Sequence, residues 1–286
     1  MKKIYTLLAF AIGFSINAQI ATNGTNPSGT DASAMGRETT ASEYYSTAMG
    51  YQTTASGAAS TAMGDDTTAS GYASTAMGDD TTASGDYSTA MGDDTTASGH
   101  WSTAIGFGTT ASGSRSTAMG YSTEASDYAS LVIGQHNLLG STVTNSATEF
   151  STDNTAFVIG NGANTDNRSD ALTVLFDGTT TIAGDLSINS DARLKANIIS
   201  LGSTLAKVLQ IDGKSYTMKK DDNQKQKIGV LAQDIEKVFP ELVSESNGVK
   251  SVNYQGLVPV LINALKEQQT EIDELKEMVQ ALVSSE

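Results

Sequence analysis

The residues of this chain that could do chemistry together lie in one short stretch, Ser190-Asp191-Ala192-Arg193-Leu194-Lys195. A serine hydroxyl becomes a nucleophile when a base within hydrogen-bond reach takes its proton, and a neutral lysine amine can be that base. A lysine five residues after a serine meets this need only if the chain folds back between them. Both residue types are common on protein surfaces, so a solvated turn is the alternative interpretation of this spacing alone.

Two further motifs follow this hexapeptide: KIGVLAQDIEKVFPELV at residues 227–243 and VNYQGLVPVLI at residues 252–262. Together, the three motifs closely resemble the peptidase S74 family, the self-cleaving intramolecular chaperone domains found at the C-termini of phage tail spikes and endosialidases. In that family, the serine that opens the motif cuts the peptide bond on its own N-terminal side, with the lysine as base. The resemblance therefore implies a single-turnover serine endopeptidase that acts on its own chain, without a cofactor and without external substrates.

Carried onto this sequence, the resemblance implies that Ser190 is the nucleophile, Lys195 the base and Asn189-Ser190 the scissile bond. Asp191 also matches the family motif, and it could either orient the site or cap the following helix. A lysine must be neutral to act as a base, although the reference pKa of its side chain is about 10.4. Burial and the neighbouring Arg193 would favour the neutral amine, whereas Asp191 would favour the charged form. An assembled oligomer could supply the necessary burial, so cleavage would depend on correct assembly.

A unit of 14 residues, Ser-Thr-Ala-Met-Gly-x-x-Thr-Thr-Ala-Ser-Gly-x-x, occurs in about eight copies within the first two thirds of the chain. A short fixed period is typical of a solenoid, in which each unit buries its apolar face only by stacking on its neighbours. The runs Ser-Thr-Ala-Met and Thr-Ala-Ser predict short strands, and the variable pair after each glycine predicts a corner. Alternation along the strand would direct one face into the interior and the other toward a partner chain. The Met position of the unit is occupied by Met35, Met49, Met63, Met77, Met91, Ile105, Met119 and Ile133.

This repeat resembles the left-handed parallel β-roll of the YadA-like heads of trimeric autotransporter adhesins, with Thr where that family more often has Val. The resemblance implies a homotrimer. We therefore expect a mainly β fold with a C-terminal α+β domain: a trimeric β-roll solenoid, then a small chaperone domain that ends in a long coiled-coil helix. With a rise of about 4.8 Å for each turn, the roll would be about 40 Å long. A disordered low-complexity chain is the alternative for such a composition.

Two kinds of corner residue could bind a ligand. Acidic pairs in three successive turns would form a ladder of carboxylates, which is a candidate calcium site because hard cations take several carboxylate oxygens. A solvated acidic edge is the alternative interpretation. Aromatic corner residues, among them Tyr44, Tyr45, Tyr72, Tyr87 and Trp101, are candidates for binding anchors or for structural stacks. The acidic pairs are Asp65-Asp66, Asp79-Asp80 and Asp93-Asp94.

The amino-acid composition limits the classes of molecule that could bind this chain. Residues 19–189 hold 18 Asp and Glu against three Arg and no Lys, so nucleic acids and anionic membranes would be repelled. The absence of cysteine excludes disulfides and thiolate metal sites. The two histidines, His100 and His136, have no ligand or catalytic set near them in sequence.

The N-terminus has the pattern of a secretory signal. Lys2-Lys3 precede an apolar run at residues 5–16 and the small pair Asn17-Ala18, which predicts cleavage after Ala18 and export to the exterior or the cell surface. A short buried helix is the alternative. No later stretch approaches the roughly 20 apolar residues of a membrane-spanning helix, so no integral membrane segment is expected after removal of the signal.

These observations divide the chain into a signal peptide (1–18), a linker (19–30), head repeats (31–162), a β-rich connector (163–189) and a chaperone domain (190–286). Within the last domain the pattern predicts a helix at 201–209, strands at 215–218 and 227–231, a helix at 233–239 and a long helix at about 256–284. The long helix has heptad spacing, which predicts a coiled coil; packing on its own domain is the alternative. The heptad positions are Leu261, Leu265, Gln268, Ile272, Leu275, Val279 and Leu282.

The leading hypothesis is an exported, homotrimeric, adhesin-like fibre whose C-terminal domain drives assembly and then cleaves the chain at Asn189-Ser190. The alternative is a structural or adhesive surface protein in which the Ser-Lys pair is inactive and the C-terminal domain stays attached as a trimeriser. A third hypothesis is that the Thr and Ser ladders bind ice or a repetitive glycan. The ligand of the head is not evident from the sequence, nor is whether Ser190 and Lys195 act within one chain or across chains.

Overall fold

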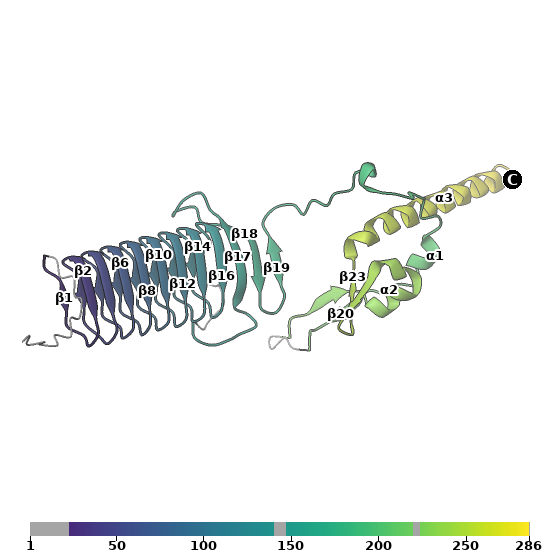
Figure 1. The fold of residues 1–286 in the computed structure, drawn as a ribbon. Coiled ribbons are helices and arrows are strands. Elements are labelled where there is room, and N and C mark those ends of the chain that lie inside the picture. The colour runs from purple at the N-terminus through teal and green to yellow at the C-terminus, as the bar shows by residue number, and fades with distance from the viewer. Residues whose placement is uncertain (1–22, 140–146, 220–223, 286) are drawn as a thin grey trace, which may run out of the picture. The chain divides into compact units, whose positions relative to one another are not determined.

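The computed structural model describes residues 23–139, 147–219 and 224–285 (Figure 1). The predicted signal peptide lies outside these residues. The chain divides into two compact units between Ser187 and Ile188, and each unit is described by itself. The first unit is a β-solenoid and the second is a small α+β region, which confirms the predicted fold class.

The solenoid is built directly from the 14-residue repeat (Figure 1). Successive turns pair in parallel without a shift in register, so Met63 lies opposite Met77 and Gly64 opposite Gly78. One sheet is formed by the long strands β2 (Ser33–Arg37), β4 (Thr47–Tyr51), β6 (Thr61–Asp65), β8 (Thr75–Asp79), β10 (Thr89–Asp93), β12 (Thr103–Phe107), β14 (Thr117–Tyr121) and β16 (Leu131–Gln135). The other is formed by the short strands β1 (Asn26–Pro27), β3 (Thr40–Ala41), β5 (Thr54–Ala55), β7 (Thr68–Ala69), β9 (Thr82–Ala83), β11 (Thr96–Ala97), β13 (Thr110–Ala111) and β15 (Glu124–Ala125).

The corners differ from the sequence prediction by one residue. The long strand continues through its glycine to the first residue of the variable pair, so Asp65 belongs to β6 and only Asp66 turns the chain, with φ of 46°. The glycine itself is required by close packing between turns. Gly64 has φ of 130°, and a Cβ there would lie 1.9 Å from the carbonyl oxygen of Gly78, so a side chain cannot be accommodated.

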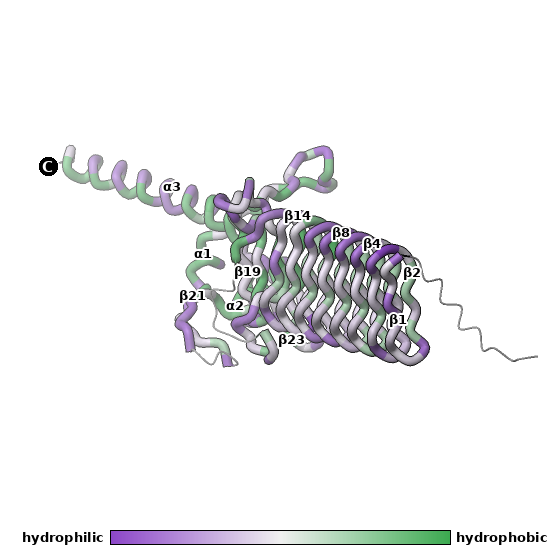
Figure 2. The backbone as a smooth tube through the Cα atoms, turned by 90° about the vertical axis from the view of Figure 1, so that its left-hand side faces the viewer, coloured by the Kyte–Doolittle hydropathy of each residue, from purple (hydrophilic) through white to green (hydrophobic). Residues whose placement is uncertain are grey.

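The interior of the solenoid is narrow and holds only small side chains. In one turn, Ala62, Ala69, Ser60 and Thr67 are all fully buried. The hydroxyls of Ser60 and Thr67 have no hydrogen-bond partner among the described residues, and burying such groups is unfavourable. The interior therefore contributes little apolar area, and much of the apolar surface lies outside, where the methionine row is half-buried or exposed. Figure 2 shows that hydrophilic residues gather along one edge of the turns near β4 and β8.

The parallel stack ends with a change of strand direction. After an insertion, β17 (Thr155–Asn161) continues the stack with Ile159 opposite Ile133. The next two strands, β18 (Asp170–Leu175) and β19 (Thr180–Ile182), are antiparallel and are joined by a turn at Asp177-Gly178. These strands end the regular ladder.

The second unit has a small core made by Ile235, Phe239 and Val260. Its elements are η1 (Ala192–Leu194), α1 (Leu205–Val208), β20 (Lys214–Tyr216), β21 (Lys227–Gly229), α2 (Ala232–Val238), η2 (Pro240–Leu242), β22 (Val243–Ser246), β23 (Val249–Val252), η3 (Tyr254–Gly256) and α3 (Leu257–Val283). The short strands, the helix before Pro240 and the long last helix agree with the predictions. The helix predicted at 201–209 is wrong in extent, because only its second half is helical.

One element of this unit was not predicted. The strands β22 and β23 form an antiparallel hairpin around Asn247-Gly248, whose φ values are 52° and 75°. Two positive φ values in a two-residue turn are typical of a tight hairpin, and Asn-Gly is its strongest sequence signal. That dipeptide could therefore have revealed the hairpin.

Candidate self-cleavage site

The candidate site lies on an exposed turn at the start of the second unit. The short 3-10 helix η1 follows Asp191, whose Oδ1 accepts a hydrogen bond from the backbone N–H of Arg193 at 2.8 Å. The Arg193 guanidinium also pairs with the carboxylate, with Nη2 at 2.6 Å from Oδ2. These hydrogen bonds hold the pKa of Asp191 below its usual range. Asp191 therefore caps the turn, which is one of the two roles that the sequence left open. Its carboxylate also pairs with the Arg193 guanidinium.

The turn brings the predicted nucleophile and base together. The backbone N–H of Lys195 donates to the carbonyl of Ala192 at 3.1 Å, which closes the turn. Its Nζ then donates to Oγ of Ser190 at 2.7 Å. Asp191 is paired with Arg193, and Lys195 Nζ lies against the serine hydroxyl. For catalysis this same hydrogen bond would have to reverse, with a neutral amine accepting the hydroxyl proton.

The segment around this pair has many apolar side chains and little cover within its own chain. Every residue from 183 to 203 is exposed to solvent. A soluble surface rarely carries so many apolar side chains in one stretch. The apolar members, between 51% and 86% exposed, are Leu186, Ile188, Leu194, Ile198, Ile199 and Leu201.

A glutamate of α3 that no sequence motif singled out fixes the chain beyond this segment. Glu267 of α3 accepts hydrogen bonds from the backbone N–H groups of Thr204 and Leu205, at 2.5 Å and 3.1 Å, at the start of α1. The hydroxyl of Ser203 donates to the same carboxylate at 2.7 Å. These bonds hold the pKa of Glu267 below its usual range. A side chain 63 residues away in sequence thus replaces a local cap, which is why local patterns did not reveal it.

The lowered pKa of Glu267 predicts a pH effect. Since the folded pKa lies below the unfolded one, the cap stabilises the fold above the unfolded pKa of about 4.3 and is lost as pH falls through the folded pKa. We expect Glu267→Ala to lower the melting temperature at pH 7 by a few degrees, and the difference from wild type to shrink toward pH 3. Circular dichroism at a helical wavelength measures it on the full chain.

A matched control for this experiment lies one turn further along α3. Glu271 makes no hydrogen bond or ion pair with the described residues. Glu271→Ala should therefore leave the melting temperature nearly unchanged at both pH values. An equal loss in both variants would contradict the capping role of Glu267.

The terminal helix α3 uses only its first turns to pack on its own unit. Val260 and Ala264 are buried, whereas the predicted heptad positions are exposed. Leu265 is 70% exposed and Leu275 57% exposed. The apolar stripe is therefore without a partner in the single chain. No helix among the described residues combines the length and apolar character needed to cross a bilayer.

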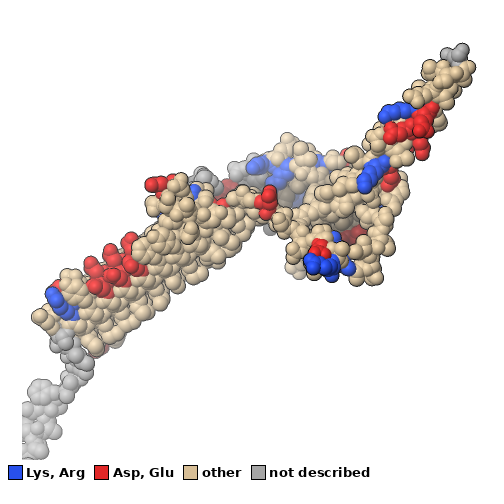
Figure 3. Space-filling view, turned by 90° about the horizontal axis from the view of Figure 1, so that it is seen from above, with Lys and Arg blue, Asp and Glu red and all other residues tan. Residues whose placement is uncertain are grey.

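The acidic pairs of the head lie in the expected ladder. Figure 3 shows red carboxylates gathered along one edge of the solenoid. Within residues 23–139, 147–219 and 224–285, however, no group of three or more acidic or histidine side chains is arranged to hold a metal ion. The carboxylate-bearing residues Asp65, Asp79 and Asp93 lie opposite one another on three paired strands.

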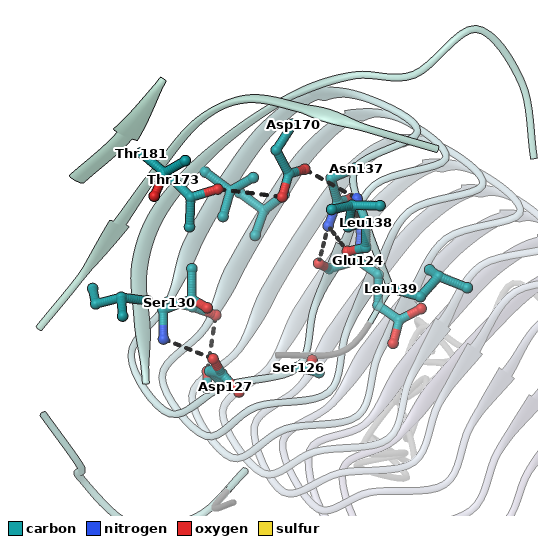
Figure 4. Close-up of a pocket in the computed structure, with 14 residues that line it drawn as sticks. Glu124, Ser126, Asp127, Ser130, Asn137, Leu138, Leu139, Asp170, Thr173 and Thr181 are labelled. Atoms are coloured by element: carbon teal, nitrogen blue, oxygen red, sulfur yellow. Dashed lines mark hydrogen bonds between the residues drawn. The ribbon is translucent and has the colours of Figure 1, made fainter. Parts of the chain in front are cut away.

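A cavity of about 350 Å³ lies at the last turns of the solenoid (Figure 4). Two of its carboxylates depart from the repeat: Glu124 stands where the six preceding turns have Thr, and Asp127 where the five preceding turns have Gly. Asp127 is buried, and its Oδ2 accepts from the backbone N–H of Thr155 at 2.7 Å. Asp170 accepts from the N–H of Leu138 at 3.0 Å, and burial raises the pKa of Asp170. The carboxylates of Asp127 and Asp170 thus accept hydrogen bonds from backbone groups where regular stacking ends.

Comparison with known families and proteins gives matches to both parts of the chain. Residues 28–137 match the YadA head domain repeat in seven overlapping windows. Residues 190–244 match the family described as chaperone of endosialidase, also called Peptidase_S74, and the match begins at Ser190.

Three relatives are long tail fiber proteins named Gp37. That of Salmonella phage S16 is 32% identical over 108 residues, which cover 34% of this chain and 14% of the relative. Those of Enterobacteria phages M1 and Ox2 are each 34% identical over 115 residues, which cover 35% of this chain and 46% of the relative. Each alignment therefore spans less than half of the relative's own length. The chain thus has a region that matches the YadA head repeat, followed in the predicted order by a C-terminal region that matches the endosialidase chaperone family, and it is similar in part to phage tail fibres.

Proposed function

We propose that this protein is a homotrimeric, adhesin-like fibre whose C-terminal domain guides assembly and then cleaves the chain once, between Asn189 and Ser190. The observation that carries the proposal is the hydrogen bond of 2.7 Å between Lys195 Nζ and Ser190 Oγ. It lies at the start of the segment that matches the endosialidase chaperone family. The same similarities fit an exported or surface location, with residues 1–18 as the signal peptide.

The proposed reaction needs only groups of the chain and water. Lys195 takes the hydroxyl proton of Ser190 as Oγ attacks the carbonyl carbon of Asn189. The bond between that carbon and the Ser190 nitrogen breaks, an ester to Oγ forms, and the proton passes to the released amine. Water then hydrolyses the ester, which leaves a carboxylate on Asn189 and restores the serine hydroxyl.

Assembly would supply the environment that this reaction requires. In the single chain the turn is exposed to water, and burial is what favours the neutral form of an amine. Three features would gain cover from other chains: the apolar segment around the site, the heptad stripe of α3 and the methionine row of the head. A partner that covers them would remove apolar surface from water. Cleavage would then follow correct assembly.

The position of the scissile bond fits the release of an intact head. The two compact units meet between Ser187 and Ile188, two residues before Asn189-Ser190. Cleavage there would separate the solenoid from the α+β unit without cutting a strand or helix of either. The solenoid would persist as the mature fibre.

Production of the full-length wild-type chain tests this function. We expect two products, one that ends at Asn189 and one that comprises residues 190–286, on a denaturing gel and in an intact-mass spectrum. Light scattering on the same sample should give the mass of a trimer for the head. A chain that is trimeric yet stays intact would favour the alternative, a non-cleaving surface protein that keeps its C-terminal domain as a trimeriser.

A further inference from the structure

One corner of the solenoid carries a continuous row of aromatic and cationic side chains, which we call the aromatic edge. Its members come from five successive turns: Tyr72, Tyr87, His100, Trp101, Arg115 and Tyr128. The rings of Tyr87 and Trp101 are stacked, with centroids 5.8 Å apart and an angle of 20° between planes. Tyr72 meets Tyr87 edge-on at 5.2 Å. The edge is thus one connected group of rings.

The backbone holds these rings in a fixed row. Tyr87, Trp101 and Arg115 occupy the same position of the repeat and have φ values of 57°, 57° and 61°. Parallel pairing without a shift in register then sets them roughly 4.8 Å apart along the solenoid. Such a row loses little conformational freedom on binding, which favours recognition.

The row is open to solvent and has a cation without an acidic partner. Tyr72, Tyr87 and Trp101 are 49%, 47% and 47% exposed. The Arg115 guanidinium lies 4.8 Å from the ring centre of Trp101 and 5.1 Å from that of Tyr128. It forms no ion pair with any residue that the structure describes. Arg115 Nη1 donates to the hydroxyl of Tyr128. The other N–H groups of Arg115, and the indole N–H of Trp101, are donors beside flat apolar faces.

We propose that the aromatic edge binds a neutral glycan. The C–H groups on one face of a pyranose ring carry partial positive charge and would lie on the negative face of an aromatic ring. Sugar hydroxyl oxygens would accept from Arg115 and Trp101. The 18 acidic residues of residues 19–189, against three arginines, disfavour a polyanionic chain. The inference goes beyond the proposed self-cleavage and does not depend on it.

The opposite corner supplies a matched comparison. Phe107 and Tyr121 stack there with centroids 5.0 Å apart and an angle of 8°, and they are 43% and 48% exposed. No guanidinium or ammonium group lies over either ring among the described residues. This pair has the exposed rings of the aromatic edge without its donor.

The experiment uses the purified protein as produced, cleaved or uncleaved, because the aromatic edge lies in the solenoid in both cases. The probes are three neutral hexasaccharides, cellohexaose, mannohexaose and maltohexaose. Trp101 is the single tryptophan of the chain, so its fluorescence should change in a saturable way with at least one of them. By calorimetry, Tyr87→Ala, Trp101→Ala and Arg115→Ala should each weaken that binding by about tenfold or more. Tyr121→Ala should leave it within about twofold.

Three outcomes would overturn the inference: no saturable response to any of the three sugars, an equal loss in Tyr121→Ala, or tighter binding of oligogalacturonate, which carries a carboxylate on each sugar. A second arm compares a glycoprotein rich in neutral glycans with its deglycosylated form. Loss of binding on deglycosylation supports a glycan ligand carried by a protein. Equal binding of both forms would show that the edge takes a protein surface, against the inference.

Discussion

Ser190→Ala will keep the chain at full length under conditions in which wild type separates into two products. No hydroxyl remains to attack the carbonyl of Asn189, so the first bond cannot form. Lys195→Ala should reduce the cleavage rate by several orders of magnitude, since removal of one member of such a unit costs nearly all of its catalysis. Lys195→Arg should fail equally, because a guanidinium keeps its proton at any working pH. Densitometry of a denaturing gel over time measures all three variants.

All three variants should still assemble, since both side chains are exposed in the single chain and neither belongs to its core. Ser187→Ala is the matched control, because it removes a hydroxyl three residues earlier and should cleave at the wild-type rate. If Ser190→Ala is still cut at the same bond, the nucleophile is another group. If Ser190→Ala also fails to form the trimer, its loss of cleavage reflects failed assembly and does not support Ser190 as the nucleophile.

The second large effect concerns the heptad stripe of α3. We expect Leu275→Asp to abolish assembly and, with it, cleavage. A charge left unpaired in a buried seam costs roughly 3–5 kcal/mol for each chain. The fold of the single unit should persist, since Leu275 is 57% exposed and lies far along the helix from Val260 and Ala264. Light scattering and gel densitometry on the same preparation measure mass and cleavage together.

Thr270→Asp provides the control for this variant. Thr270 lies on the same helix, outside the heptad positions, and bonds only to the carbonyl of Lys266. The added charge should remain in water and leave mass and cleavage unchanged. A Leu275→Asp chain that assembles and cleaves normally would mean that the stripe stays exposed in the mature protein.

Much of the fold could be predicted because the information was local and repeated. The 14-residue period predicted the solenoid, and its turns pair in parallel without a shift in register. The error at the corners has a physical reason. The chain turns at the residue with positive φ, such as Asp66, and composition alone does not distinguish it from Asp65.

The second unit was harder to predict because long-range contacts decide it. The helix expected at 201–209 begins only at Leu205, where Glu267 supplies acceptors for the first N–H groups. No local pattern encodes that cap. The Asn247-Gly248 hairpin was a local signal that went unused. The candidate site lies between these cases: the motif singled out Ser190 and Lys195, which the structure brings into contact, while the sequence alone did not decide that Asp191 caps η1.

The unchanged register of the solenoid has a consequence for its length. Each turn contacts only its neighbours, and every rung presents the same backbone groups to the next. Adding or deleting one 14-residue unit would therefore lengthen or shorten the rod by roughly 4.8 Å and leave all other rungs as they are. The length of the solenoid can thus vary in equal steps of one turn, without a change in the closing strands β18 and β19. Side chains at the corners would keep their own neighbours while their distance from the end of the rod changes.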